Sequence, residues 1–166
     1  QDLSKTFPFG QGWGMGPVNP TLWNDWKTAE PSDVRREASI INIPSELPNY
    51  AKGGWADFVQ ETDYWQKKYS PVSAKKADGS YASSYSVLMY NTAENFQLDN
   101  TMDIVVIRLA DVYLMHSELT GTVTYMNKVR ERAKLAPKAA YSLADLQNER
   151  RWELAFEGTR WNDIRR

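Results

Sequence analysis

The sequence predicts a mainly α-helical protein with long irregular loops and only minor β-sheet. Three stretches in the last third of the chain, 109–119, 123–134 and 142–157, carry apolar residues at helical spacing. The earlier residues are repeatedly interrupted by proline and glycine and are rich in tryptophan and tyrosine. The length favours a single domain. We therefore expect residues 1–100 to form a loop-rich aromatic segment and residues 101–166 to form a helical core.

The glycine-rich stretch Phe7–Pro20 is predicted to be a loop. Glycine occupies every second position from 10 to 16. A dinucleotide-binding fingerprint would need a preceding strand and a following helix, and two prolines interrupt this stretch instead. Trp13 stands between two of the glycines, so its indole either projects from the loop or folds back onto the core.

Three short elements are expected in the rest of the first hundred residues. Thr21–Ala29 has the spacing of a short helix, which Pro31 ends. Glu37–Ile43 and Tyr85–Tyr90 are predicted to be strands.

Two turns are also predicted in this part of the chain. Asp33 and Arg35 are expected to hold loop backbone, because aspartate readily accepts hydrogen bonds from nearby N–H groups. Residues 70–84 contain few apolar side chains and include Asp78 and Gly79, a pair typical of a turn. This second stretch is therefore expected to be an exposed loop or the tip of a hairpin.

The last third of the chain predicts a helical hairpin. Residues 101–108 are β-branched and apolar and should form an extended entry. Residues 109–119 leave no broad polar face, which predicts a buried helix. Residues 123–134 carry one apolar stripe, with Arg130 and Arg132 at its two margins.

The final long helix carries an acidic row between two apolar sides. It is expected to begin after Ser142 and to end at Gly158. Glu149, Glu153 and Glu157 are spaced four residues apart, so they lie on one side of this helix. Unpaired buried carboxylates cost several kcal/mol each, so the row must be neutralised by cations from elsewhere. The arginines expected to do this are Arg108, Arg130, Arg132 and Arg160.

A catalytic alternative remains open for the same row. Glu149 and Glu153 are close enough on a helix to flank a glycosidic bond, as the two carboxylates of a glycoside hydrolase do. That reading needs both carboxylates to face an open cleft, whereas the helical spacing places them between apolar faces.

The composition excludes several other classes of function. The formal net charge of −1 gives no argument for nucleic-acid binding. There is no cysteine, so disulfides and thiolate metal sites are absent, and the single histidine, His116, has no metal-ligand companions at useful spacing. No metal and no cofactor are therefore expected. No apolar run in the sequence is long enough to span a bilayer.

The C-terminal third also resembles a known family. The segments VIRLADVYLMHSE, YMNKVRERA and NERRWELAFEGTRWNDIRR resemble the signature of the SusD/RagB family of outer-membrane nutrient-binding lipoproteins. The segments GWGMGPVNPTL, SDVRREASI and KKY stand upstream in the order expected for that family. The resemblance implies a SusD-like fold of tetratricopeptide-type helical hairpins. Family members are several times longer, so residues 1–166 are expected to be the C-terminal part of such a domain. The N-terminal half, with its lipidated cysteine, would then be absent.

The resemblance further implies binding without catalysis. Members of the family capture glycans, and in some cases peptides, at the surface of the outer membrane and deliver them to a SusC-like TonB-dependent transporter. Any membrane attachment would be through a lipid anchor outside this chain. Sugar rings bind flat aromatic faces on loops that a scaffold holds in place. The ligand-binding candidates are Trp13, Trp55, Tyr81 and Tyr85. A helical scaffold without a small ligand is a further alternative.

Overall fold

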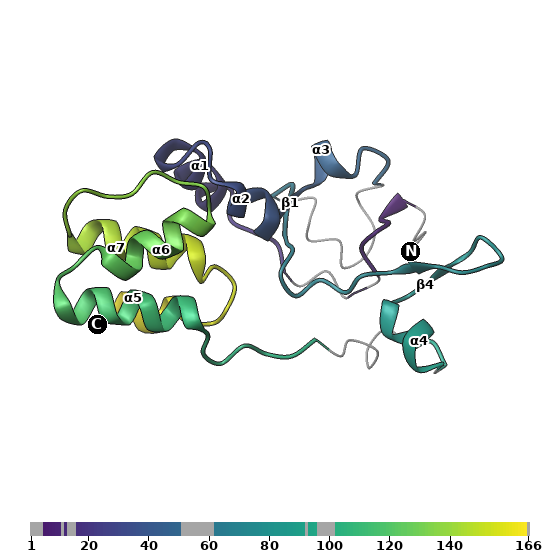
Figure 1. Ribbon diagram of the computed structural model, residues 1–166. Helices are drawn as coiled ribbons and strands as arrows, with labels where there is room; N and C mark the ends of the chain where they lie inside the picture. The colour runs from purple at the N-terminus through teal and green to yellow at the C-terminus, as the bar shows by residue number, and fades with distance from the viewer. Residues whose placement is uncertain are drawn as a thin grey trace. The chain divides into compact units, whose positions relative to one another are not determined.

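The computed structural model describes residues 5–10, 12, 16–50, 62–91, 93–95 and 102–165. It divides the chain into two compact units (Figure 1). The loop-rich unit comprises residues 1–21 and 40–103, and the helical unit comprises residues 22–39 and 104–166. The predicted mainly α fold with minor β-sheet is confirmed. Residues 22–39, which the sequence analysis assigned to the loop-rich segment, belong to the helical unit.

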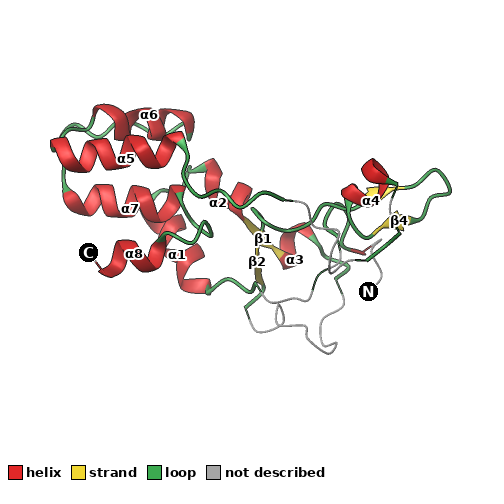
Figure 2. Cartoon of the chain, turned by 90° about the horizontal axis from the view of Figure 1, so that it is seen from below, coloured by secondary structure: helices red, strands yellow, loops and turns green. Residues whose placement is uncertain are grey.

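The helical unit contains six helices within the described residues, and Figure 2 shows them in red. None of the described helices is both long enough and apolar enough to cross a membrane. The helices are α1 (Pro20–Ala29, which begins in the other unit), α2 (Val34–Ser39), α5 (Leu109–Thr120), α6 (Thr124–Arg132), α7 (Leu143–Glu153) and α8 (Arg160–Arg165).

Helices α5, α6 and α7 enclose one apolar cluster. Leu114, Met126, Val129 and Leu146 are buried together, each from the inward side of its helix. Met126 and Val129 lie three positions apart on α6, so they share one side of that helix and pack against α5 and α7. Gly121, at φ +64°, makes the left-handed turn that lets α5 and α6 form an antiparallel hairpin.

The second contact of α7 is aromatic. Trp26 of α1 stacks on Trp152 of α7 with ring centroids 5.2 Å apart, and both rings are buried. The start of α7 matches its prediction, because the hydroxyl of Ser142 accepts a hydrogen bond from the N–H of Asp145. The end differs: α7 stops at Glu153 rather than at Gly158, and Phe156 has a left-handed φ of +68°.

The prediction that 109–119 is buried on all sides is wrong within this chain. Leu114 is fully buried, but Leu109 is 62% exposed and Leu119 is 87% exposed. The apolar residues of α5 lie on two opposite sides of the helix, and α6 and α7 cover one side only.

The loop-rich unit contains two small antiparallel sheets in its described part. Strand β1 (Ile40–Asn42) pairs with β2 (Tyr64–Gln66), and β3 (Ala74–Lys75) pairs with β4 (Tyr81–Ala82). The short helices α3 (Ile43–Glu46) and α4 (Tyr85–Tyr90) follow β1 and β4. A small apolar cluster of Ile41, Ile43 and Leu47 lies beside the first sheet.

The β3–β4 hairpin confirms the turn expected within residues 70–84. Gly79 has φ +84°, and the Asp78 carboxylate accepts a hydrogen bond from the N–H of Ser80 at 2.9 Å. Short hydrogen-bonded turns of this kind connect antiparallel strands directly.

Two strand predictions need correction. Only residues 40–42 of the predicted strand 37–43 are extended, because α2 occupies residues up to Ser39. Residues 85–90 form helix α4 rather than a strand. Their apolar side chains follow one another without the alternation that a half-buried strand requires, and the left-handed Asn91 ends the helix.

Gly10 lies unusually close to a neighbouring segment of the loop-rich unit. Its N–H donates to the carbonyl of Pro71 at 2.7 Å, next to the bridge between Phe9 and Val72. A Cβ atom on Gly10 would lie only 2.2 Å from the backbone oxygen of Ser83. Only glycine permits this approach without a backbone shift.

Replacing Gly10 by alanine should therefore lower the free energy of unfolding by about 1–3 kcal/mol, through overpacking against rigid backbone. The matched control is Gly12→Ala, because a Cβ atom there meets nothing within 4 Å. Urea unfolding of both variants measures the difference. Equal losses for the two variants would show that the Gly10 approach is not a constraint.

Candidate functional site

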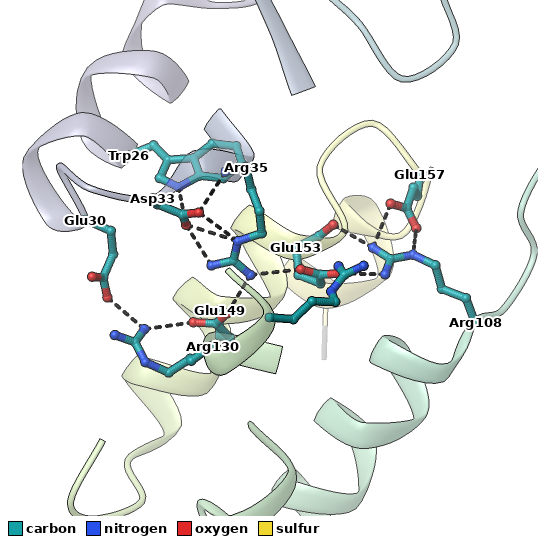
Figure 3. A network of polar contacts seen from close by, with 10 residues as sticks. Trp26, Glu30, Asp33, Arg35, Arg108, Arg130, Glu149, Glu153 and Glu157 are labelled. Atoms are coloured by element: carbon teal, nitrogen blue, oxygen red, sulfur yellow. Dashed lines mark hydrogen bonds and ion pairs between the residues drawn. The ribbon is translucent and has the colours of Figure 1, made fainter. Parts of the chain in front are cut away.

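A cluster of buried charges lies around α7 in the helical unit (Figure 3). We call it the ion-pair cluster. Its centre is formed by Glu149 and Glu153, whose side chains are each only 1% exposed. The cluster consists of Glu30, Asp33, Arg35, Arg108, Arg130, Arg132, Glu149, Glu153 and Glu157.

Arg35 joins the two central glutamates. One of its terminal nitrogens, Nη1, donates to Glu149 Oε1 at 2.6 Å and to Glu153 Oε2 at 2.8 Å. Residues four positions apart in a helix lie one turn apart on the same face, so one planar guanidinium can reach both. Helix α2 is thereby fixed to α7 across 114 residues of sequence.

Asp33 holds the Arg35 guanidinium in place. Its carboxylate accepts from Arg35 Nη2 at 2.7 Å and from Arg35 Nε at 2.9 Å. The same carboxylate accepts the backbone N–H of Arg35 and the indole N–H of Trp26 at 2.8 Å. Asp33 thus holds backbone as expected, but this backbone is the first turn of α2 rather than a loop. Arg35, expected to hold loop backbone as well, bonds carboxylates instead.

The remaining oxygen of Glu149 is bonded to a second arginine. Arg130 Nη1 donates to Glu149 Oε2 at 2.9 Å and to Glu30 Oε1 at 2.7 Å. Its Nε donates to the carbonyl of Ala136 at 2.9 Å. Arg130 thus connects α6, the end of α1 and α7.

The other oxygen of Glu153 is bonded to two further arginines. Arg108 Nη1 donates to Glu153 Oε1 at 2.5 Å, and Arg132 donates to the same oxygen. Arg108 also binds Glu157 with two parallel hydrogen bonds of 2.7 Å and 2.8 Å. This bidentate geometry is the strongest form of an arginine–carboxylate pair.

A separate arginine fixes the C-terminal helix. Arg150, which follows Glu149 in α7, donates to Asp111 of α5 at 2.7 Å and to Asp163 of α8 at 3.0 Å. Both sides of α7 are therefore held by charged contacts to distant segments of the helical unit.

Burial and ion pairing act in opposite directions on the central carboxylates. Burial raises the pKa of Glu149, and Arg35 and Arg130 offset that rise only in part. Glu153 is also desolvated, but hydrogen bonds from Arg35 and Arg108 outweigh that effect and hold its pKa below the usual range. Arg35 and Arg108 have raised pKa values and stay charged, because the hydrogen bonds that they donate to the carboxylates, together with the attraction of those negative charges, exceed the effect of burial.

The structure brings most of the expected ion-pair residues together. Arg108, Arg130 and Arg132 all contact the acidic row. Arg160 is exposed on α8 and forms no ion pair with the row in the described part of the chain. Sequence reasoning missed Arg35 as the central partner. Its only signal was the neighbouring Asp33, which pointed to a local contact rather than to one with α7.

Two of the four ligand-binding candidates lie in described residues of the loop-rich unit. Tyr81 begins β4 and is half-buried, with its ring tilted against Phe7 at a centroid distance of 5.4 Å. Tyr85 begins α4 and is 54% exposed. Trp13 and Trp55 lie outside the described residues.

The described side chains offer no arrangement of three or more His, Asp or Glu residues suited to a metal ion. His116 is exposed on α5 and packs edge-on against the ring of Tyr125 at 4.5 Å.

The helical unit is a helical-hairpin scaffold held by the ion-pair cluster, and the loop-rich unit has exposed aromatic residues. The family model described as the SusD family matches residues 21–166, and the chain belongs to this family. The matched residues include the whole ion-pair cluster.

The known relatives are much longer than this chain. It is 25% identical to SusD-like protein P2 of Formosa agariphila, over 97% of this chain and 33% of that protein. It is 35% identical to a SusD-like protein of Bacteroides ovatus, over 41% of this chain and 14% of that protein. A solved structure described as a laminarin binding SusD-like protein aligns with a TM-score of 0.69 and 30% identity. That alignment covers 94% of this chain and 31% of the other.

Replacing Glu153 by alanine should lower the free energy of unfolding by about 3–5 kcal/mol, because it removes the buried carboxylate that Arg35 and Arg108 share and leaves their buried positive charge only partly neutralised. The control is Asp25→Ala, which removes an exposed carboxylate paired with Arg151 and should cost less than about 1 kcal/mol. Chemical denaturation measures both values. A loss near zero for Glu153→Ala would show that the row is solvated.

The helical unit should also lose stability in acid. Glu153 and Asp33 have lowered pKa values, so the unfolded chain binds their protons at higher pH than the folded chain does. Their stabilisation is present above about pH 4.5 and is lost as the pH falls below their ordinary pKa. The contribution of Glu149 to the pH dependence of stability has the opposite sign, because its raised pKa means that the folded chain binds its proton at higher pH than the unfolded chain does.

The measurement is the free energy of unfolding between about pH 3 and pH 6, for the wild-type chain and for Glu153→Gln. The wild-type stability should decline on the acid side, and the substitution should flatten that decline. An identical pH dependence in the two proteins would contradict the assigned role of Glu153.

Proposed function

We propose that the chain is part of a non-catalytic glycan-binding protein of the bacterial cell surface. Membership of the SusD family supports this, as does the similarity to a protein described as laminarin binding. The observation that carries the proposal is the state of Glu149 and Glu153, whose four carboxylate oxygens all accept hydrogen bonds from arginines.

Carboxylates in that state are poor catalysts. A glycoside hydrolase needs one carboxylic acid to protonate the leaving group and one carboxylate to attack or to activate water. Here both glutamates are 1% exposed and are held by guanidinium groups, so neither carboxylate is exposed to solvent for this chemistry. We therefore assign the acidic row to the scaffold and ligand recognition to the aromatic residues.

The recognition surface in this proposal lies in the loop-rich unit. Tyr85 exposes more than half of its surface, and Phe7, which packs against Tyr81, is 46% exposed. Aromatic rings of this kind provide flat apolar faces for the C–H-rich faces of sugars, with the tyrosine hydroxyl as a polar group. Trp13 and Trp55 are proposed to contribute from outside the described residues.

The proposal extends to partners and location. The captured oligosaccharide would pass to a SusC-like TonB-dependent transporter, with the protein held at the outer-membrane surface by a lipid anchor outside this chain. A peptide ligand is the alternative for the same surface. The formal net charge of −1 gives no support for a strongly charged ligand of either kind.

The test is calorimetric titration with laminarin oligosaccharides, followed by a screen of other glycans. Tyr85→Ala should weaken binding about tenfold, because it removes a stacking face, while Tyr85→Phe retains most of the affinity. Trp161→Ala is the control, since Trp161 is 66% exposed on α8 in the other unit and should leave affinity unchanged.

The same incubations should release no reducing ends. Steady hydrolysis that disappears in Glu149→Gln would replace the binding proposal with the enzymatic alternative. Equal affinity of Tyr85→Ala and the wild-type chain for every glycan that binds would remove the recognition surface from the loop-rich unit.

A further inference from the structure

The β3–β4 hairpin of the loop-rich unit carries a lysine directly beside an aromatic residue. Lys75 of β3 lies opposite Tyr81 of β4 in the antiparallel register, and β4 is labelled in Figure 1. Residues directly opposite each other in an antiparallel pair have their side chains on the same face, with Cβ atoms about 5 Å apart. The side chain of Lys75 therefore starts next to the ring of Tyr81.

A second segment brings another ring against Tyr81. The N–H of Ser73 donates to the carbonyl of Pro8 at 2.8 Å, so the segment around Pro8 lies along the stretch that leads into β3. Phe7 packs against Tyr81 with ring centroids 5.4 Å apart and is 46% exposed. We call Phe7, Lys75 and Tyr81 the hairpin platform. It consists of two rings in contact and one exposed lysine.

The charge of Lys75 is not neutralised within the described part of the chain. The neighbouring Lys76 forms an ion pair with the carboxylate of Glu94. At the tip of the hairpin, the carboxylate of Asp78 accepts hydrogen bonds from the N–H and the hydroxyl of Ser80. Lys75 forms no ion pair with any described residue and is exposed. The hairpin platform therefore has a local positive charge that an external anion can neutralise.

Two rings beside an unpaired ammonium group suit a sugar with a negative charge. The rings provide apolar surface for the C–H-rich face of a sugar ring. The ammonium group is a compact point charge with three donors, which can bond a carboxylate or a sulfate oxygen at the edge of that sugar. The formal net charge of −1 for the whole chain gives no general attraction for a polyanion. The acidic groups of a fitting ligand are therefore sparse.

From these observations we propose that the hairpin platform selects a largely neutral glycan that carries an acidic sugar. Lys75 bonds the acidic group, and Phe7 and Tyr81 contact a sugar ring. This inference rests on the proposed function, because it assigns the charge preference of the glycan that the loop-rich unit binds. It gives Lys75 a role in discriminating between glycans that share one backbone.

The test compares glycans that differ only in charge. Calorimetric titration uses neutral laminarin oligosaccharides, the same oligosaccharides with a glucose unit oxidised at C6 to glucuronate, and the same oligosaccharides with a sulfate ester. Every other backbone that binds in the glycan screen is compared in the same three forms. The wild-type chain should bind an acidic form about threefold or more tightly than the neutral form, through one exposed ion pair. This preference should shrink as the ionic strength rises. The acidic form that is preferred distinguishes a carboxylate from a sulfate ligand.

The variant Lys75→Gln should abolish the preference, because it removes the unpaired ammonium group and keeps a side chain of similar length. Lys76→Gln is the matched control. It removes the same charge from the adjacent position, but from a lysine that Glu94 already neutralises, and should keep the preference.

Equal affinity of the wild-type chain for the neutral and acidic forms would overturn the inference and leave the proposed function in place. An equal loss of preference in Lys75→Gln and Lys76→Gln would also overturn it, because the attraction would then be unspecific. Failure of every glycan in the screen to bind would contradict the proposed function, and this inference with it.

Discussion

The guanidinium of Arg35 between Glu149 and Glu153 is the contact on which the helical unit depends. Two carboxylates one helical turn apart and out of contact with water repel each other, and each carries a large desolvation cost. A single planar cation that bonds both relieves these effects together. Because Asp33 fixes that cation, the position of residues 33–39 relative to α7 follows from electrostatics as well as from packing.

The other arginines extend this constraint over the helical unit. Arg108 enters from the segment before α5, and Arg130 enters from α6. Arg108 donates to Glu153 Oε1 and Arg130 donates to Glu149 Oε2. The two segments therefore cannot exchange places without leaving a buried charge unpaired. The cluster thereby specifies one arrangement of the helices. Every carboxylate of the cluster is paired with an arginine, which is why we assign recognition to the aromatic residues of the loop-rich unit.

The sequence predicted those features whose signals are local or periodic. The α5–α6 hairpin, the Ser142 cap and the turn at Gly79 follow from residue spacing and turn chemistry. The acidic row was visible because its members are one turn apart. Arg35 was not, because nothing in the sequence reveals a contact across 114 residues, and the adjacent Asp33 offered a simpler local explanation.

The central claim is that Arg35 and Glu153 are energetically coupled, and a double-mutant cycle measures this directly. Arg35→Met, Glu153→Gln and the double variant are unfolded in denaturant, and the interaction free energy is taken from the cycle. The account predicts that the single substitutions together cost more than the double one, with a coupling of about 2 kcal/mol or more. A coupling near zero would contradict it.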